Sequence, residues 1–211
     1  MFFRDAWMAQ ASTQDRWPFP VRGPPTMVAN PACGKAGEVS LAIMRTPALI
    51  VATLAVGLMA GVFALYSNAI MPGLRRTDDR TFVGALQGID TAIVNPLFLG
   101  TFMGALGATG VSVALHLGKD FRSVLPWIVV AFVLYLAVVV ITLAVNVPLN
   151  DHIKAAGAPD SIADLAGVRD QFNESKWVGW NHFRAVATTA AFGCLAWALV
   201  LLGRVGSPDG P

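Results

Sequence analysis

Hydrophobic residues along the chain gather into four long stretches that contain no charged side chain. Each stretch is close to or above the roughly 20 apolar residues that a helix needs to cross the hydrocarbon core of a bilayer. Inside that core each backbone polar group must bond within its own segment, so such stretches form helices. The uncharged runs cover residues 46–74, 91–118, 123–150 and 185–203. They predict an all-α integral membrane four-helix bundle, with helices at about 47–69, 94–117, 124–146 and 182–203.

Residues typical of helix ends frame these stretches. Asn95 followed by Pro96 reads as a helix cap with proline at the first helical position. Pro72 and Pro148 follow the first and third apolar runs, and we interpret both as helix stops. Gly57 is one of several small residues at four-residue spacing, a pattern typical of closely packed membrane helices.

The connection before the fourth helix, from Asp151 to Trp180, is too long for a simple turn. Within it, apolar residues recur at near-helical spacing, and Ser161 and Asp164 resemble a capping box at the start of a helix. The apolar positions are Ile162, Leu165, Val168 and Phe172. We predict a short amphipathic interfacial helix between helices three and four.

The first 43 residues show neither a long apolar run nor apolar residues at helical or strand spacing. They contain several arginines and prolines and no apolar segment of the kind that a signal peptide requires. We expect a disordered N-terminal tail over 1–43, a transmembrane domain over 44–204 and a C-terminal tail over 205–211. An alternative is that translation starts at Met44, so that the tail lies upstream of the true start.

The composition is typical of a membrane protein and limits the kinds of partner that the protein is expected to have. Hydrophobic residues make up 55% of the chain and charged residues only 13%, about half the share usual in soluble domains. The net charge of +2 and the absence of a basic run argue against nucleic acid as a partner and leave the lipid bilayer as the expected one. The two cysteines, Cys33 and Cys194, do not suggest a disulfide framework.

The distribution of positive charge gives an expected orientation. Four spans place both termini on one side, and the short loop Gly118–Arg122 on that side carries two positive residues. Short loops weigh most in the positive-inside rule, so we expect both termini in the cytoplasm and the protein in the cell membrane. The oligomeric state is not predicted.

Polar residues gather at one end of the predicted bundle, where helices one and three end and helices two and four begin. Polar groups at this depth are costly and usually face the bundle interior or a cavity. The same residues could equally act as helix caps and interfacial anchors. The candidate site residues are Tyr66, Asn68, Asn95, Asn146, Asn150, Trp180, Asn181, His182 and Arg184.

Several of these residues belong to longer runs that resemble a known family. The order and spacing of these runs are similar to those of the anthrone oxygenase-like family of small four-helix membrane proteins. The runs are 58–63 (LMAGVF), 67–74 (SNAIMPGL), 94–98 (VNPLF), 145–150 (VNVPLN) and 177–184 (WVGWNHFR).

The resemblance implies a cofactor-independent oxygenase, without a metal, that oxidises a flat aromatic or polyketide substrate with O₂. In this interpretation His182 is the base that removes a proton, since an ordinary histidine pKa suits that task. Arg184 and nearby asparagines would stabilise an enolate oxygen, and aromatic residues at the mouth, such as Tyr66 and Trp180, would hold a flat ring.

Two alternatives stay open. The chain could be a non-enzymatic small membrane protein, an assembly partner or a transport accessory, in which case the polar residues are only caps. It could also bind haem or a metal through His116, His152 or His182, although none of these lies centrally in a predicted helix and no metal-binding spacing is present.

Overall fold

The computed structural model describes residues 31–205, with side chains from residue 43 to residue 204. The chain divides into two units, residues 1–37 and 38–211. Within the described range every regular element is a helix. Of the tails predicted over 1–43 and 205–211, the parts 1–30 and 206–211 lie outside the described residues, whereas residues 31–43 and 205 are helical.

Eight α-helices and four short helical turns follow one another along the described chain. Two of the turns are π-helical, Tyr66–Ile70 and Thr142–Asn146, and are called the first and second π turns below. The short 3₁₀ turns are Lys119–Phe121 and Pro159–Ser161. The α-helices are α1 (Pro31–Leu65), α2 (Met71–Leu74), α3 (Asp79–Ile93), α4 (Pro96–Leu115), α5 (Leu125–Ile141), α6 (Val147–Ala155), α7 (Leu165–Phe172) and α8 (Glu174–Val205).

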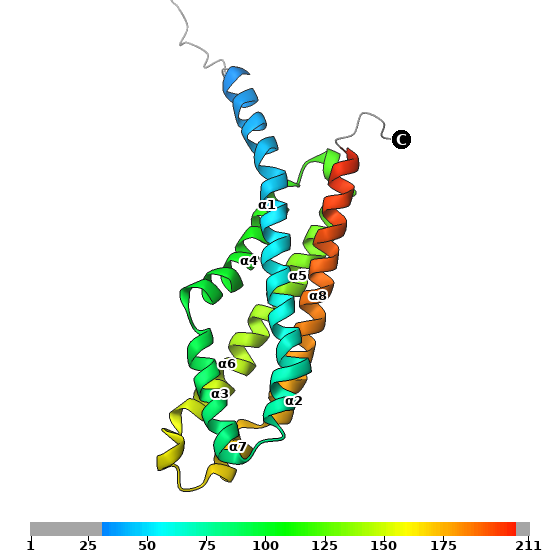
Figure 1. Cartoon of the computed structure of the whole chain (residues 1–211). Helices are drawn as coiled ribbons and strands as arrows, with labels where there is room; N and C mark the ends of the chain where they lie inside the picture. The colour runs from blue at the N-terminus through cyan, green and yellow to red at the C-terminus, as the bar shows by residue number, and fades with distance from the viewer. Residues whose placement is uncertain (1–30, 206–211) are drawn as a thin grey trace, which may run out of the picture. The chain divides into compact units, whose positions relative to one another are not determined.

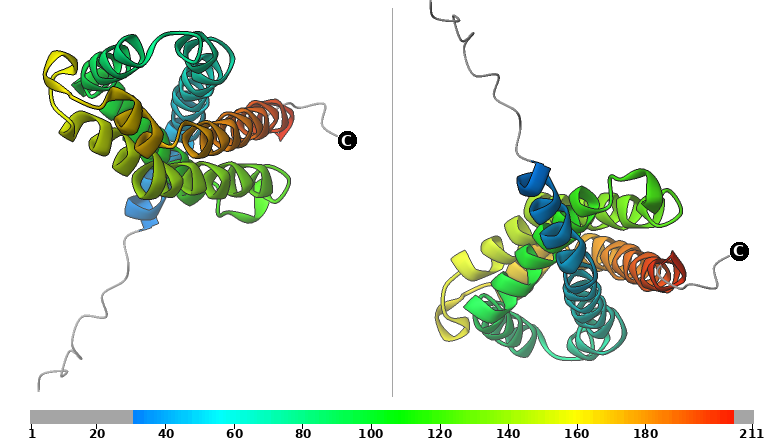
Figure 2. Two further views of the ribbon diagram at one scale, coloured as in Figure 1. Left: turned by 90° about the horizontal axis from the view of Figure 1, so that it is seen from below. Right: turned by 90° about the horizontal axis from the view of Figure 1, so that it is seen from above.

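Four helical segments are long and apolar enough to cross a membrane, as the uncharged runs predicted. They are Ile43–Leu74, Pro96–Leu115, Leu125–Ala155 and Leu165–Arg204. The views along the bundle in Figure 2 place α8 between α1 and α5, and α4 packs against α5. Gly57 of α1 lies against Phe192 of α8 so closely that an added Cβ would be 2.9 Å from the ring. The chain is therefore a helical membrane bundle.

Pro72 and Pro148 do not end their helices, so their interpretation as stops was wrong. Each proline follows a π turn, in which a backbone N–H bonds the carbonyl five residues earlier: Met71 bonds Tyr66, and Val147 bonds Thr142. Proline has no N–H and its ring presses on the carbonyl four residues before it. The wider π turn makes room for that ring, so each helix continues in the same direction (Figure 1).

Two helices also begin earlier than predicted. The helix of the first span starts at Pro31 rather than near 47, because polar residues outside the apolar run can still form helix. The fourth starts at Glu174 rather than 182, directly after Asn173, which has a positive φ of 53°. The Asn173 side chain accepts the N–H of Lys176 at 3.1 Å and so caps this start.

The connection between the first two spans contains a helix that hydropathy alone did not reveal. α3 begins after Asp78, whose side chain accepts the N–H of Thr81 at 3.0 Å. One face of α3 buries Phe82, Val83 and Leu86 against α6 and α7. This second core also contains Met71, Ile153, Phe172 and Trp177.

The predicted amphipathic helix is present as α7. Asp164 is its N-cap, accepting the N–H of Gly167 at 2.8 Å, whereas Ser161 lies in the preceding 3₁₀ turn and does not cap it. The four apolar residues that predicted the helix all belong to the second core, Phe172 within it and the others packed against it.

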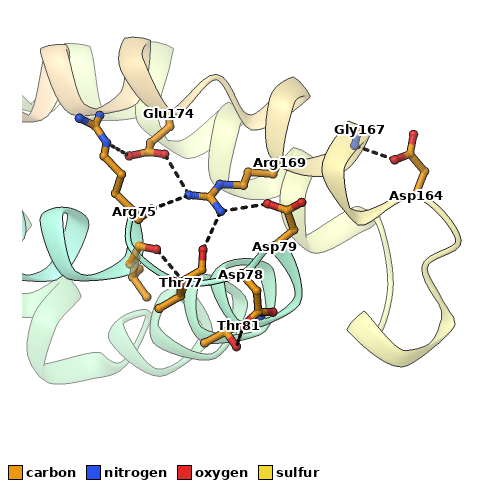
Figure 3. A network of polar contacts seen from close by, with 10 residues as sticks. Arg75, Thr77, Asp78, Asp79, Thr81, Asp164, Gly167, Arg169 and Glu174 are labelled. Carbon is orange, nitrogen blue, oxygen red and sulfur yellow. Dashed lines mark hydrogen bonds and ion pairs between the residues drawn. The ribbon is translucent and has the colours of Figure 1, made fainter.

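A network centred on Arg169 of α7 ties this helix to the corner between α2 and α3 (Figure 3). Arg169 donates to the Thr77 carbonyl at 3.1 Å and to the Asp79 carboxylate at 2.9 Å, and it lies 4.1 Å from the ring centre of Phe82. Glu174 accepts from Arg75 at 2.7 Å. These contacts hold α3 and α7 over one end of the bundle.

Candidate functional site

A cavity of about 170 Å³ lies inside the bundle at the level of the two π turns. All four spans and α3 contribute to its wall. The volume is comparable to the cavity of about 150 Å³ that holds benzene in a well-studied protein core. The enclosed part is therefore large enough for one aromatic ring. The lining residues used below are Phe63, Tyr66, Asp90, Phe98, Phe102, Thr142, Asn146, Asn150, Trp177 and Arg184.

Arg184 of α8 is the one cation among the lining residues, and only 5% of its surface is exposed. Its guanidinium donates to the Thr142 hydroxyl at 3.2 Å and to the Asn181 amide oxygen at 2.8 Å. Its Cζ also lies 4.6 Å from the ring centre of Phe63 and 5.4 Å from that of Trp177. Among residues 43–204 no carboxylate lies within ion-pair distance of it.

Asn181 holds Arg184 in place from behind the cavity wall. One turn before Arg184 on α8, its side chain is 1% exposed and donates to the Phe63 carbonyl at 3.0 Å and to the Ser67 hydroxyl at 2.7 Å. Asn181 therefore joins α8 to the end of α1 and the first π turn, and its amide oxygen faces the guanidinium. It is a positioning residue, since it does not line the cavity itself.

A second set of polar residues lies on the α3 and α6 side. Asn150 donates to the Asp90 carboxylate at 2.6 Å and accepts the indole N–H of Trp177 at 2.7 Å. Asp90 also pairs with Lys154 at 2.7 Å, and Lys154 pairs with Asp151 at 3.1 Å. The one carboxylate of the cavity is thus already neutralised by a lysine.

Asn146 lies between these two sets, on the second π turn. It is 1% exposed and donates to the Trp177 carbonyl at 3.3 Å. Its amide oxygen is buried and has no hydrogen-bond partner among the described residues, and the same is true of the Nε atom of Arg184. A buried polar atom without a partner costs free energy, so these two atoms are available to a ligand.

The other walls are aromatic. Phe98 and Phe102 of α4 stack with their rings parallel at 5.9 Å, and Phe63 meets Phe102 edge to face at 6.4 Å. Tyr66 packs against Trp177 at 5.6 Å. The cavity therefore combines flat apolar walls with a few polar groups, as ligand sites in proteins commonly do.

The mouth of the cavity faces sideways, out of the bundle. Its exposed rim is entirely apolar and comes from the α3–α4 corner and α4 on one side and the second π turn and α6 on the other. The rim residues are Val94, Leu99, Met103, Leu143 and Val147. Four of the five lie within membrane-spanning segments, so the opening is turned toward lipid.

The structure brings together about half of the residues that the sequence proposed for the site. Tyr66, Asn146, Asn150 and Arg184 line the cavity, with Asn181 directly behind. The remaining four are exposed and do not line it: Asn68, Asn95, Trp180 and His182.

Three of these four have a local explanation, and Asn68 makes no side-chain hydrogen bond among the described residues. Asn95 caps α4, since its side chain accepts the Phe98 N–H at 3.0 Å, so the capping alternative holds there. His182 bonds the Val178 carbonyl of its own helix at 2.9 Å, and Trp180 packs on Phe183. His182 is next to Asn181 in sequence, but adjacent residues on a helix point about 100° apart, which turns it away from the cavity.

Asp90 and Thr142 are the polar lining residues that the sequence analysis missed, and it also missed the aromatic ones, Phe63, Phe98, Phe102 and Trp177. Asp90 lies in the connection between the first two spans, for which the sequence analysis made no prediction, although its spacing on α3 from the buried Phe82, Val83 and Leu86 is helical. Thr142 looked like an ordinary residue of an apolar run. Among the described residues no group of three or more His, Cys, Asp or Glu side chains could hold a metal ion.

Comparison with known proteins agrees with the motifs. The family model for anthrone oxygenase matches residues 92–194, which is just under half of the chain and carries most of the cavity-lining residues. No curated protein and no solved structure matches the chain. Over residues 92–194 the chain is therefore similar in sequence to the anthrone oxygenase family.

Proposed function

We propose that the chain is a cofactor-independent oxygenase that converts an activated CH₂ group of a flat aromatic substrate into a carbonyl group with O₂. The observation that carries this proposal is Arg184, a buried cation that faces an aromatic cavity and has no carboxylate partner within residues 43–204. Such a cation stabilises negative charge that develops on a ligand oxygen. The family match supports the reaction class.

The reaction needs no bound redox group, because the substrate itself supplies the electrons. Loss of one proton from the CH₂ group gives an enolate whose charge lies mainly on the carbonyl oxygen. The enolate carbon then bonds to O₂, which becomes a peroxide, and a proton converts that peroxide to a hydroperoxide. Loss of the second C–H proton with cleavage of the O–O bond gives the new carbonyl group and one water molecule. One O₂ is consumed for each carbonyl formed.

The roles of the residues follow from their positions. Arg184 would bind the enolate oxygen, and Asn146 and Asn150 would orient the polar edge of the substrate. Phe98, Phe102 and Tyr66 would hold the ring by stacking, with one ring enclosed and further rings extending through the apolar mouth. His182 is exposed, so we no longer propose it as the base.

The membrane would deliver both reactants. Flat aromatic molecules and O₂ both partition into lipid, and the apolar rim opens between α4 and the second π turn toward that phase. We further propose that the protein lies in the cell membrane with both termini in the cytoplasm. The cavity would then be nearer the opposite face, where the first and third spans end.

Oxygen uptake by the purified protein tests the proposal. With an anthrone as substrate we expect one O₂ consumed and one anthraquinone formed per turnover. Arg184→Gln should lower kcat/KM by about 100-fold or more, as loss of an oxyanion donor commonly does. His182→Ala should retain activity, and Arg204→Gln, the same change on the same helix outside the cavity lining, is the matched control.

Two results would contradict the proposal. The first is no O₂ uptake above the spontaneous rate by folded wild-type protein, which would favour a non-enzymatic binding or accessory role. The second is equal loss in Arg184→Gln and Arg204→Gln, which would remove Arg184 from the chemistry.

A further inference from the structure

The charges around the cavity do not balance. Four ionisable side chains face it or contact a group that does: Tyr66 from the first π turn, Asp90 from α3, Lys154 from α6 and Arg184 from α8. α4 contributes only apolar residues to the lining. Asp90 and Lys154 cancel each other. The second carboxylate on Lys154, that of Asp151, is exposed and does not line the cavity, so Arg184 leaves the buried site with a net charge of +1.

A buried charge that lacks a counterion is costly. In proteins an uncompensated ion costs several kcal/mol, and the neutral acceptors Thr142 and Asn181 offset only part of that. The cost is relieved if the bound ligand carries one negative charge. It would be made worse by a neutral ligand that displaced water and added no acceptor.

The two unpartnered atoms specify the polar edge of that ligand. The Nε–H of Arg184 requires an acceptor, and the amide oxygen of Asn146 requires a donor. A ring that carries an anionic oxygen and a neighbouring hydroxyl group would satisfy both. None of the lining residues supplies an unpaired carboxylate or a histidine that could act as a strong base.

We infer that the site selects its ligand as a ring-bearing monoanion, so that the ligand's own ionisation, stabilised by Arg184, takes the place of a protein base. This inference rests on the proposed function for its catalytic meaning, but it concerns binding and is tested without turnover. It predicts that the pH dependence of the reaction follows the acidity of the substrate and differs from one substrate to the next.

A coloured phenol that is not a substrate provides the test. 4-Nitrophenol has one ring, which suits the cavity of about 170 Å³, and its absorption shifts when it ionises. Titrating it with excess detergent-solubilised protein gives the ionisation midpoint of the bound dye. We expect this midpoint to fall by about one pH unit or more relative to protein-free micelles, because a charge-assisted bond favours the anion by about tenfold or more.

Four variants separate the inference from nonspecific binding. Arg184→Gln should abolish the shift, and Arg204→Gln should keep it. Asn181→Asp would place a carboxylate beside the Arg184 guanidinium and should also abolish the shift while the arginine remains in place. Asp90→Asn should keep or enlarge it, because Lys154 then loses its buried partner and retains only the exposed Asp151.

The outcomes are decisive in each direction. A midpoint that rises on binding, or a shift that survives in both Arg184→Gln and Asn181→Asp, overturns the inference. A normal dye shift without O₂ uptake on any anthrone leaves the inference standing and refutes the oxygenase. Uptake whose pH profile stays the same for substrates of different acidity, and which Asp90→Asn abolishes, shows instead that a protein base acts.

Discussion

Removal of the Asn181 side chain should destabilise the bundle far more than removal of another asparagine on the same membrane face. In Asn181→Ala, three hydrogen bonds disappear at once: two that join α8 to α1 and the first π turn, and one that Arg184 donates. The matched control is Asn68→Ala, since Asn68 is exposed on the first π turn and has no side-chain bond among the described residues.

The magnitude follows from the kind of bond lost. Interhelical hydrogen bonds in membranes contribute about 0.6 kcal/mol on average. A bond from a charged donor contributes about 1.5–3 kcal/mol, and here its loss leaves a buried guanidinium N–H without a partner. We therefore expect Asn181→Ala to lower the free energy of unfolding by about 3 kcal/mol. Asn68→Ala should stay within about 0.5 kcal/mol of the wild type.

Thermal unfolding in detergent measures the difference. For a chain of this size about 3 kcal/mol corresponds to a fall in Tm of roughly 6–12 °C. A Ser67→Ala and Asn181→Ala double-mutant cycle would isolate the bond between those two side chains, which should account for well under half of the total. Equal Tm values for Asn181→Ala and Asn68→Ala would refute the assignment of Asn181 as the residue that holds α8 to α1.

Three further predictions concern the ends of the bundle. Burial lowers the pKa of His116, and the charge of Arg45 adds to the effect, so protonation of His116 opposes folding. The stability of the folded protein should be full above pH 6.5 and should fall as the pH drops below that value. Unfolding midpoints measured at pH 8 and pH 5 should differ in the wild type, and His116→Phe should remove this part of the difference. Arg169→Ala and Arg169→Lys should both loosen the corner between α2 and α3, since lysine lacks the planar group that donates to both Thr77 and Asp79. Amide hydrogen exchange in residues 75–82 should become faster in both variants, and unchanged protection in Arg169→Lys would contradict this. Reporter fusions at residues 85 and 165 should report one side of the membrane and those at 120 and 208 the other, with 85 and 120 on the same side as the result that overturns the four-span topology.

The spans could be predicted from the sequence because a bilayer imposes one simple requirement, a long run without charge. The short α7 was predictable for a related reason, since an apolar stripe at helical spacing must be buried against something, here the second core. α3 has the same kind of stripe, but it contains charged residues and is not an uncharged run, so the search for uncharged runs did not find it. The positions of the prolines were misinterpreted because hydropathy does not reveal a π turn.

The candidate site was harder to predict because it depends on the direction in which each side chain points around its helix. Asn181, His182 and Arg184 lie within four consecutive positions, and only the helical angle decides which of them face inward. The extra residue of each π turn shifts that angle again, which changes which of Tyr66, Asn68 and Asn146 reach the interior. The polar end of the bundle was thus predictable as a region, and its individual members were not.

The two π turns have a consequence for chain length. A π turn is equivalent to an α-helix with one surplus residue, here one before Pro72 and one before Pro148. A shorter chain without Ala144 should keep every helix face beyond the turn in its present orientation, provided that Pro148 is replaced by alanine in the same chain. Only the wall that carries Thr142 and Asn146 would then be rebuilt. The extra residue and the proline that follows it should therefore be gained or lost together. Chains that differ in length by such an extra residue could then share this bundle and differ in the shape of their cavities.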